Sequence, residues 1–213
     1  MTGVQTCALP IFISLLILGG KDIGTVMVLT LILLGMLFIS GERIPLLLLI
    51  GGICLAVIIA LALLRPTLLL RLTAFLDPFS AAHYRGLGWQ PAHSRMALAT
   101  GGVFGVGLGG SRQKWGNLGP EAHTDFIFAV IGEEIGLLGT TIVLAAFFMI
   151  AWAGIKTAIA TRDAFSRYAV AGVTIWVIAQ ASINIGSVTG VFPVVGLPLP
   201  LVSYGGSALI SSM

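Results

Sequence analysis

Charged side chains are the scarcest feature of this sequence. Lys, Arg, Asp and Glu make up 9% of the 213 residues, whereas a soluble domain carries roughly a quarter. Cysteine is also rare, and the two residues present, Cys7 and Cys54, exclude a disulfide framework or a cysteine-rich metal site. The net charge of +3, without a stripe of Lys and Arg, argues against nucleic acid as a partner.

Apolar residues take the place of the missing charges. They account for 57% of the chain, and the mean hydropathy is +1.07. Three runs without any charge, at 23–41, 44–64 and 135–155, have the length of about 20 residues that crosses a bilayer as a helix. The sequence therefore predicts an integral membrane protein.

The fold class that follows is an all-α, polytopic transmembrane helix bundle. The apolar runs are rich in Leu, Ala, Gly and Ile and show no period of two, so helices are expected rather than a barrel. We expect residues 1–213 to form a single membrane domain that is part of a longer protein, because the last apolar run stops after about ten residues of a span. The expected spans are 8–18 (partial), 23–41, 44–64, 135–155, 168–190 and one beginning near 203.

The connections between these spans predict their orientation. The short ones, at 42–43 and 156–167, carry basic residues, which marks their side of the membrane as cytoplasmic. The long connection, residues 65–134, would then be a large extracellular loop. Within it, 96–111 is uncharged but too short and too rich in glycine to span, so we expect a re-entrant or interfacial segment.

Two motifs lie next to each other in this loop. Gly105, Gly107 and Gly110 have the G-x-G-x-x-G spacing of a dinucleotide site, but no strand precedes them, so close backbone packing is the better interpretation. Arg112, Lys114 and Trp115 follow. Their pattern suits phosphate contact at the lipid headgroups or an ordinary interfacial Lys/Trp pair, and the spacing alone does not separate the two.

Four of the eight acidic residues are concentrated in residues 118–136, as Glu121, Asp125, Glu133 and Glu134. We expect Thr124 or Asp125 to cap the apolar helix that follows, with the helix dipole keeping Asp125 ionised. Asp125 is then either only a cap or a general base at the rim of a groove.

The residues around Asp125 have their own expected roles. His123 and Glu121 would tune its carboxylate. Glu133 would be structural and would pair with Arg71 or Arg112, since acids near a membrane are usually paired. Farther along, "LPLPLVSYGGS" at 197–207 implies irregular backbone at membrane depth, and its Ser203, Gly205 and Gly206 could form one wall of the same site.

Several motifs of this sequence together resemble those of a known protein family. "PEAHTDFIFAVIGEE", "GVGLGGSRQKW", "FLDP", "INIG" and "GLPLPLVSYGGS" together resemble the SEDS family of bacterial cell-wall polymerases, and its division branch more than its elongation branch. The resemblance covers residues 21–213. The first eleven residues match nothing in it and are interpreted as foreign to the family sequence.

The resemblance implies a fold of ten transmembrane helices, of which this chain would carry five to six. It also implies a multi-pass protein of the bacterial plasma membrane, at the division septum. The activity would be polymerisation of lipid II, the polyprenyl-pyrophosphate-linked disaccharide-peptide, into glycan strands. The partners would be a class B penicillin-binding protein and other division proteins.

Within the family, the essential acid is the Asp of the "HTDF" motif, which is Asp125 here. We expect it to act as general base, with Arg112, Lys114 and Trp115 at the substrate phosphates, helped by Arg71 or by a divalent cation such as Mg²⁺ or Mn²⁺; no other cofactor is indicated. A lipid II flippase is the first alternative, although the spans hold no buried acid of the kind that translocation would use. A non-catalytic division scaffold is the second.

Overall fold

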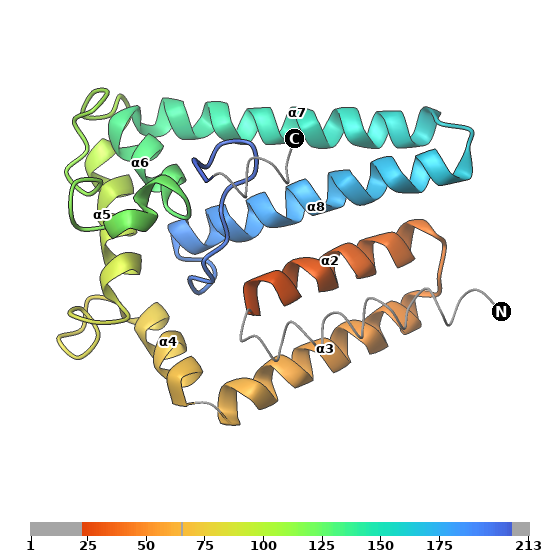
Figure 1. Cartoon of the computed structure of the whole chain (residues 1–213), viewed down its shortest axis with the longest axis horizontal. Helices are drawn as coiled ribbons and strands as arrows, with labels where there is room; N and C mark the ends of the chain where they lie inside the picture. The colour runs from red at the N-terminus through yellow and green to blue at the C-terminus, as the bar shows by residue number, and fades with distance from the viewer. Residues whose placement is uncertain (1–22, 65, 206–213) are drawn as a thin grey trace. The chain divides into compact units, whose positions relative to one another are not determined.

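The structure is a computed structural model that describes residues 23–64 and 66–205. This part of the chain contains helices and no strands (Figure 1). The prediction of an all-α protein is confirmed. The helices are α2 (Ile23–Ile39), α3 (Ile44–Leu64), α4 (Pro66–Leu76), α5 (Trp89–Gly101), the 3₁₀ helix η1 (Gly119–His123), α6 (Ile127–Glu134), α7 (Gly136–Ala160) and α8 (Ala164–Thr189).

Two of these helices are long and apolar enough to cross a membrane, Gly136–Ala160 and Ala164–Thr189, and Gly24–Ile39 and Ile44–Val57 are shorter apolar helices. They match the four complete spans expected from the sequence. The connection expected at 156–167 is only three residues long, because Asp163 Oδ2 accepts bonds from the backbone N–H (2.8 Å) and the hydroxyl (2.7 Å) of Ser166 and so caps α8 early. The expected partial span at 8–18 lies outside the described residues. Residues 203–205, where the last span was expected to begin, are not helical.

The chain divides into two compact units. The first contains the described residues up to Ile59 together with Ile150–Ala179. Its helices approach closely at glycines: the Ile175 side chain lies against Gly35, and Met36 Sδ lies against Gly172. Figure 1 shows α2 and the first part of α8 running antiparallel, so the turn after α2 and the turn before α8 lie at the same end of this unit. This agrees with the expectation that the two short connections share one side of the membrane.

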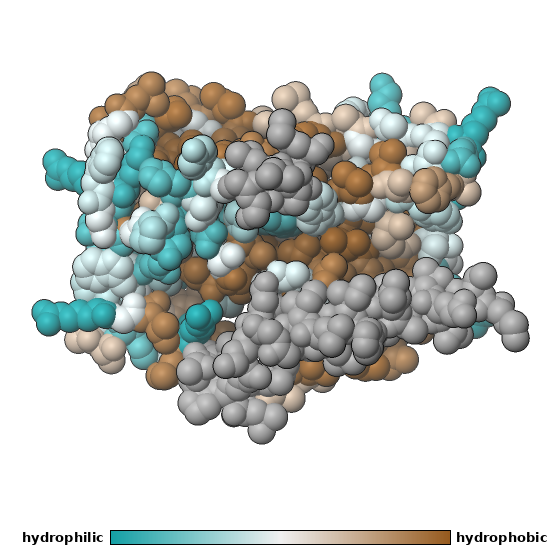
Figure 2. Space-filling view, viewed as in Figure 1, coloured by the Kyte–Doolittle hydropathy of each residue, from teal (hydrophilic) through white to brown (hydrophobic). Residues whose placement is uncertain are grey.

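The second unit contains Ala60–Met149 and the described residues from Gln180 onward. The predicted long loop is largely helical there, since it includes α4, α5, η1 and α6. Helices α5 and α6 pack with their backbones in contact, because a Cβ atom on Gly101 would overlap the carbonyl of Gly132. On the face drawn in Figure 2, hydrophilic residues gather over the segments around α5 and α6.

The glycine-rich run serves this packing. Val106 N–H donates to Glu133 O (2.9 Å) and Gly107 N–H to Glu134 O (3.0 Å), so the run closes over the C-terminal end of α6. Gly105 adopts a φ of 77° there, a conformation that favours glycine. The G-x-G-x-x-G spacing therefore reflects backbone packing.

Candidate active site

Asp125 lies in the short link between η1 and α6. The carbonyl of Glu121 accepts the backbone N–H groups of Thr124 (3.1 Å), Asp125 (3.0 Å) and Phe126 (3.2 Å), which turns the chain tightly. Helix α6 begins only at Ile127, and its N-cap position holds Phe126 without a side-chain cap. The prediction that Thr124 or Asp125 caps this helix is wrong, because the Thr124 hydroxyl bonds back to Glu121 O (3.3 Å) instead.

The surroundings of the Asp125 carboxyl group favour its protonated form more than bulk water would. The side chain is half-buried. Burial raises its pKa above the ordinary 3.8, the Thr124 hydroxyl opposes this rise, and the charge of Glu121 adds to it. The direction is opposite to the one expected from a helix dipole. A carboxylate with a raised pKa is a stronger proton acceptor once ionised.

The C-terminal loop, residues 190–205, packs against the segment that carries Asp125. The Ser203 hydroxyl donates to Thr124 O (2.5 Å) and accepts from the backbone N–H of Leu199 (2.7 Å). The backbone N–H of Tyr204 donates to His123 O (3.0 Å). At Gly196, a Cβ atom would lie 3.5 Å from Asp125 Oδ2. The structure thus brings Ser203 and its loop to the aspartate.

The other residues expected near Asp125 are distributed as follows. Glu121 is partly buried, and its Oε2 accepts from Gln90 Nε2 of α5 at 3.3 Å. The His123 side chain is exposed. Gly205 is placed beside Ser203, whose carbonyl it bonds at 3.1 Å. Gly206 lies outside the described residues.

Two amide side chains that the sequence analysis did not assign also reach this site. Asn184 of α8 is buried, and its Nδ2 donates to Asp125 O (2.8 Å) and to Leu197 O (2.6 Å). Gln180, one turn earlier, donates to Pro198 O (3.0 Å). The signal was present in the sequence, since an amide in an otherwise apolar helix requires a polar partner.

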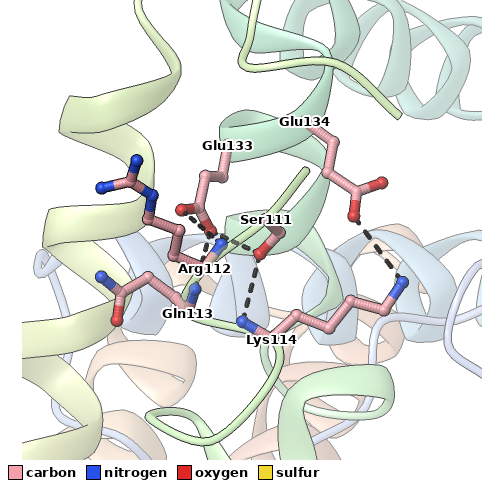
Figure 3. Close-up of polar contacts among 6 residues, drawn as sticks. All are labelled: Ser111, Arg112, Gln113, Lys114, Glu133 and Glu134. Atoms are coloured by element: carbon pink, nitrogen blue, oxygen red, sulfur yellow. Dashed lines mark hydrogen bonds and ion pairs between the residues drawn. The ribbon is translucent and has the colours of Figure 1, made fainter. Parts of the chain in front are cut away.

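A second polar cluster, the Glu133 clasp, consists of Ser111, Arg112, Gln113, Lys114 and Glu133 (Figure 3). The Glu133 side chain is 1% exposed. Its carboxylate accepts the Ser111 hydroxyl (2.5 Å) and the backbone N–H groups of Arg112 (3.1 Å) and Gln113 (3.3 Å). The prediction that an arginine side chain pairs with Glu133 is wrong, because main-chain amides and a hydroxyl satisfy this carboxylate.

The clasp fixes the backbone that displays the candidate phosphate-binding side chains. Arg112 is exposed, and Trp115 is 76% exposed. Lys114 Nζ lies 3.6 Å from Glu134 Oε1, too long for a hydrogen bond, and 5.6 Å from the centre of the Trp115 ring. A cation and an aromatic ring are therefore presented together at the surface.

The two clusters lie at opposite ends of α6. Asp125 precedes the helix and Glu133 lies in its last turn, and eight helical residues rise about 12 Å. Within the described chain, no hydrogen bond or ion pair joins Asp125 to Arg112, Lys114 or Arg71. Arg71 is an exposed residue of α4 and belongs to neither cluster. The structure therefore groups Asp125 with Ser203, and the two loop cations with Glu133.

Metal-binding groups of three or more His, Cys, Asp or Glu side chains are absent from residues 23–64 and 66–205. The expected divalent cation thus has no preformed cluster of that kind in the described chain.

Comparison with known families matches residues 3–213 to the one described as "Cell cycle protein", FtsW/RodA/SpoVE. The match includes most of the first eleven residues, which the sequence analysis had placed outside the resemblance. A protein named "Probable peptidoglycan glycosyltransferase FtsW" from Tolumonas auensis is 39% identical over 211 residues, covering 98% of this chain and 54% of the relative.

"Stage V sporulation protein E" of Bacillus subtilis is 40% identical over 195 residues, covering 92% of this chain and 52% of the relative. The chain therefore spans about half the length of the curated relatives it matches. Among solved structures, one described as "Structural coordination of polymerization and crosslinking by a peptidoglycan synthase complex" superposes with a TM-score of 0.74 at 28% identity. That match covers all of this chain and 60% of the other.

Proposed function

The chain belongs to the FtsW/RodA/SpoVE family of cell cycle proteins, and on that premise we propose that it carries the catalytic base of a peptidoglycan glycosyltransferase, Asp125. Relatives about 40% identical to it carry that enzyme's name. The observation that supports this role most strongly is the half-buried carboxylate of Asp125, whose burial raises its pKa and which has no cation partner in the described chain.

The reaction joins two lipid-linked sugars. Asp125 accepts the proton of the acceptor hydroxyl as that oxygen attacks the anomeric carbon of the donor. A new glycosidic C–O bond forms, and the bond to the polyprenyl pyrophosphate breaks, with the electron pair leaving on the pyrophosphate. A single displacement of this kind inverts the anomeric carbon. A positioned base contributes about 10²–10⁴-fold to such a step.

The separation of the two clusters suggests how the donor lies. With the acceptor hydroxyl at Asp125, the donor sugar would lie along α6 toward the Glu133 clasp. There Arg112 and Lys114 would offset charge on the leaving pyrophosphate, and Trp115 would contact the substrate beside them. Ser203, Gly205 and Gly206 would form the wall behind the acceptor. Glu121 and His123 would line its rim, and Arg71 would contact the lipid-linked substrate from α4.

The wider assignment follows the family. The substrate would be lipid II, and the partner would be a class B penicillin-binding protein that cross-links the product, together with other division proteins at the septum of the plasma membrane. The solved relative, described as a complex that coordinates polymerisation and crosslinking, supports such a partnership. By the positive-inside rule, the basic short connections would face the cytoplasm, and the long connection that carries Asp125 would face outward.

The test reconstitutes the full-length protein with its transpeptidase partner and fluorescent lipid II, and measures both glycan formation and movement between leaflets. Wild type should form glycan, and folded Asp125→Asn should form it at least about 100-fold more slowly. Polymerisation by Asp125→Asn at a rate near wild type would contradict the proposal. Leaflet crossing without polymerisation would favour a flippase, and neither activity would favour a scaffold.

A further inference from the structure

We propose that Asn184 and Gln180 of α8 are positioning residues that hold Asp125 and the C-terminal loop together as one site. This inference rests on the proposed function, in which Asp125 is the base. The two amides act on main-chain carbonyls and would not touch substrate. Their role would be to fix where the carboxylate lies relative to the loop that covers it.

The spacing of the two residues makes this possible. They are four positions apart on α8, so their side chains project from the same helix face. Gln180 Nε2 donates to Pro198 O (3.0 Å), and Asn184 Nδ2 donates to the adjacent carbonyl, Leu197 O (2.6 Å). The same Nδ2 atom also donates to Asp125 O (2.8 Å). A single amide nitrogen thus connects the loop, the helix and the link that carries the aspartate.

The orientation of the Asn184 amide is fixed by these contacts. Its Nδ2 faces two carbonyl acceptors, and the reverse orientation would place an oxygen against both of them. The Oδ1 atom is buried and has no hydrogen-bond partner in the described chain. A buried acceptor without a partner is unfavourable. Packing alone would therefore not select an asparagine at this position. The arrangement satisfies the two carbonyls at the expense of the side chain itself.

These hydrogen bonds fix the main chain at Asp125, but they do not involve its carboxylate. The carbonyl of Thr124 is held by Ser203, and the next carbonyl, that of Asp125, is held by Asn184. The loop then passes so close that a Cβ on Gly196 would lie 3.5 Å from Asp125 Oδ2. Releasing the loop would admit water to the carboxylate and weaken the burial that raises its pKa.

Other titratable groups lie in the segments around this carboxylate. Glu121 and His123 belong to η1, and Tyr204 belongs to the loop. Helix α5 contributes His93 and Arg95, and the Arg95 guanidinium lies against Gly190 of the loop. The part of α8 that holds Gln180 and Asn184, residues 180–189, has no ionisable residue. A change of Asn184 to a neutral residue therefore alters burial and position at Asp125 without altering the charges nearby.

The experiment uses the full-length enzyme with its partner and lipid II, and compares Asn184→Leu with Ser187→Ala. Ser187 is a matched control, because it is buried on the same helix but bonds only to the carbonyl of Asn184 (2.8 Å). Misplacing a reacting group by about 1 Å can cost about 100-fold. We expect kcat of Asn184→Leu to fall by that order with KM unchanged, and the acid limb of the rate to move to lower pH. Ser187→Ala should behave as wild type.

Several outcomes would overturn the inference. One is an unchanged kcat and pH profile in Asn184→Leu, and another is an equal loss in Ser187→Ala with no shift of the acid limb, which would indicate packing alone. If Asn184→Leu does not fold, Gln180→Leu replaces it, and it must show a smaller shift in the same direction. If Asp125→Asn is inactive while these variants match wild type, only this inference fails; if Asp125→Asn is active, the proposed function fails first.

Discussion

Asp125 and Glu133 lie at opposite ends of the same short helix, and their surroundings differ in one respect. At Glu133 the protein holds the carboxylate itself, through a hydroxyl and two backbone N–H groups. At Asp125 the protein holds the neighbouring main chain, through Ser203 and Asn184. Burial is the main influence on the carboxylate itself. Even the two serines follow this difference, since Ser111 donates to a side chain and Ser203 to a carbonyl.

The difference supports the proposal that Asp125, and not Glu133, is the catalytic base. A carboxylate whose oxygens already accept several donors, such as that of Glu133, stabilises the loop that supplies them. A carboxylate that is half-buried but poorly bonded is free to bind a new donor, such as a sugar hydroxyl. Glu133 is the more deeply buried of the two acids, but the distribution of hydrogen bonds supports the proposal of Asp125 as the base.

The largest effect on stability is expected at Glu133. Glu133→Ala would leave the Arg112 and Gln113 amides and the Ser111 hydroxyl without their acceptor, and each such loss costs about 1–3 kcal/mol. We expect the unfolding free energy of the full-length protein to fall by about 3 kcal/mol, measured by thermal denaturation in detergent. The neighbouring Glu134→Ala removes only one long ion pair and should cost about 1 kcal/mol or less. Equal losses from the two variants would contradict the assignment of Glu133 as the clasp.

A smaller effect is expected on the pH dependence of the rate. The charge of Glu121 helps to raise the pKa of Asp125, so Glu121→Gln should lower that pKa. Because the base must be ionised, the acid limb of the rate of glycan formation should move to lower pH. The measurement is the rate as a function of pH at constant salt. A shift to higher pH would show that Glu121 does not act on Asp125 through its charge.

The smallest effect is expected on stability at Asp125. Its carboxylate supplies few hydrogen bonds, so Asp125→Asn should change the unfolding free energy by no more than about 0.5 kcal/mol. The same denaturation experiment measures it beside Glu133→Ala. A loss as large as that of Glu133→Ala would make Asp125 a structural acid and would remove the contrast between the two ends of α6.

The membrane helices were predictable from the sequence because charge-free runs of the right length have few alternatives. The boundaries of α7 and α8 were less predictable, since the cap at Asp163 shortened a connection that looked polar. The prediction that Thr124 or Asp125 caps α6 was wrong because the carbonyl of Glu121 accepts three successive backbone N–H groups. Composition does not reveal such a local pattern. The position of Asp125 in its motif indicated it as a candidate. The hydrogen bonds around it could be identified only in the structure.

The partners of the acids were the least predictable feature. Glu133 suggested an arginine because side-chain charge is visible in a sequence, whereas the N–H groups that bind it carry no sequence signal. Asn184 was visible as a polar residue in an apolar helix, but its targets, Asp125 O and Leu197 O, are 59 and 13 residues away. Long-range contacts to main-chain atoms leave little trace in the residue pattern of one chain.

The most direct test of the account is the rate of glycan formation from lipid II by full-length Asp125→Asn, beside Asp163→Asn as a second aspartate outside the site, with both proteins shown to be folded by their melting temperatures. The account predicts a loss of at least about 100-fold for Asp125→Asn and a rate near wild type for Asp163→Asn. A folded Asp125→Asn protein that polymerises as fast as Asp163→Asn would contradict it.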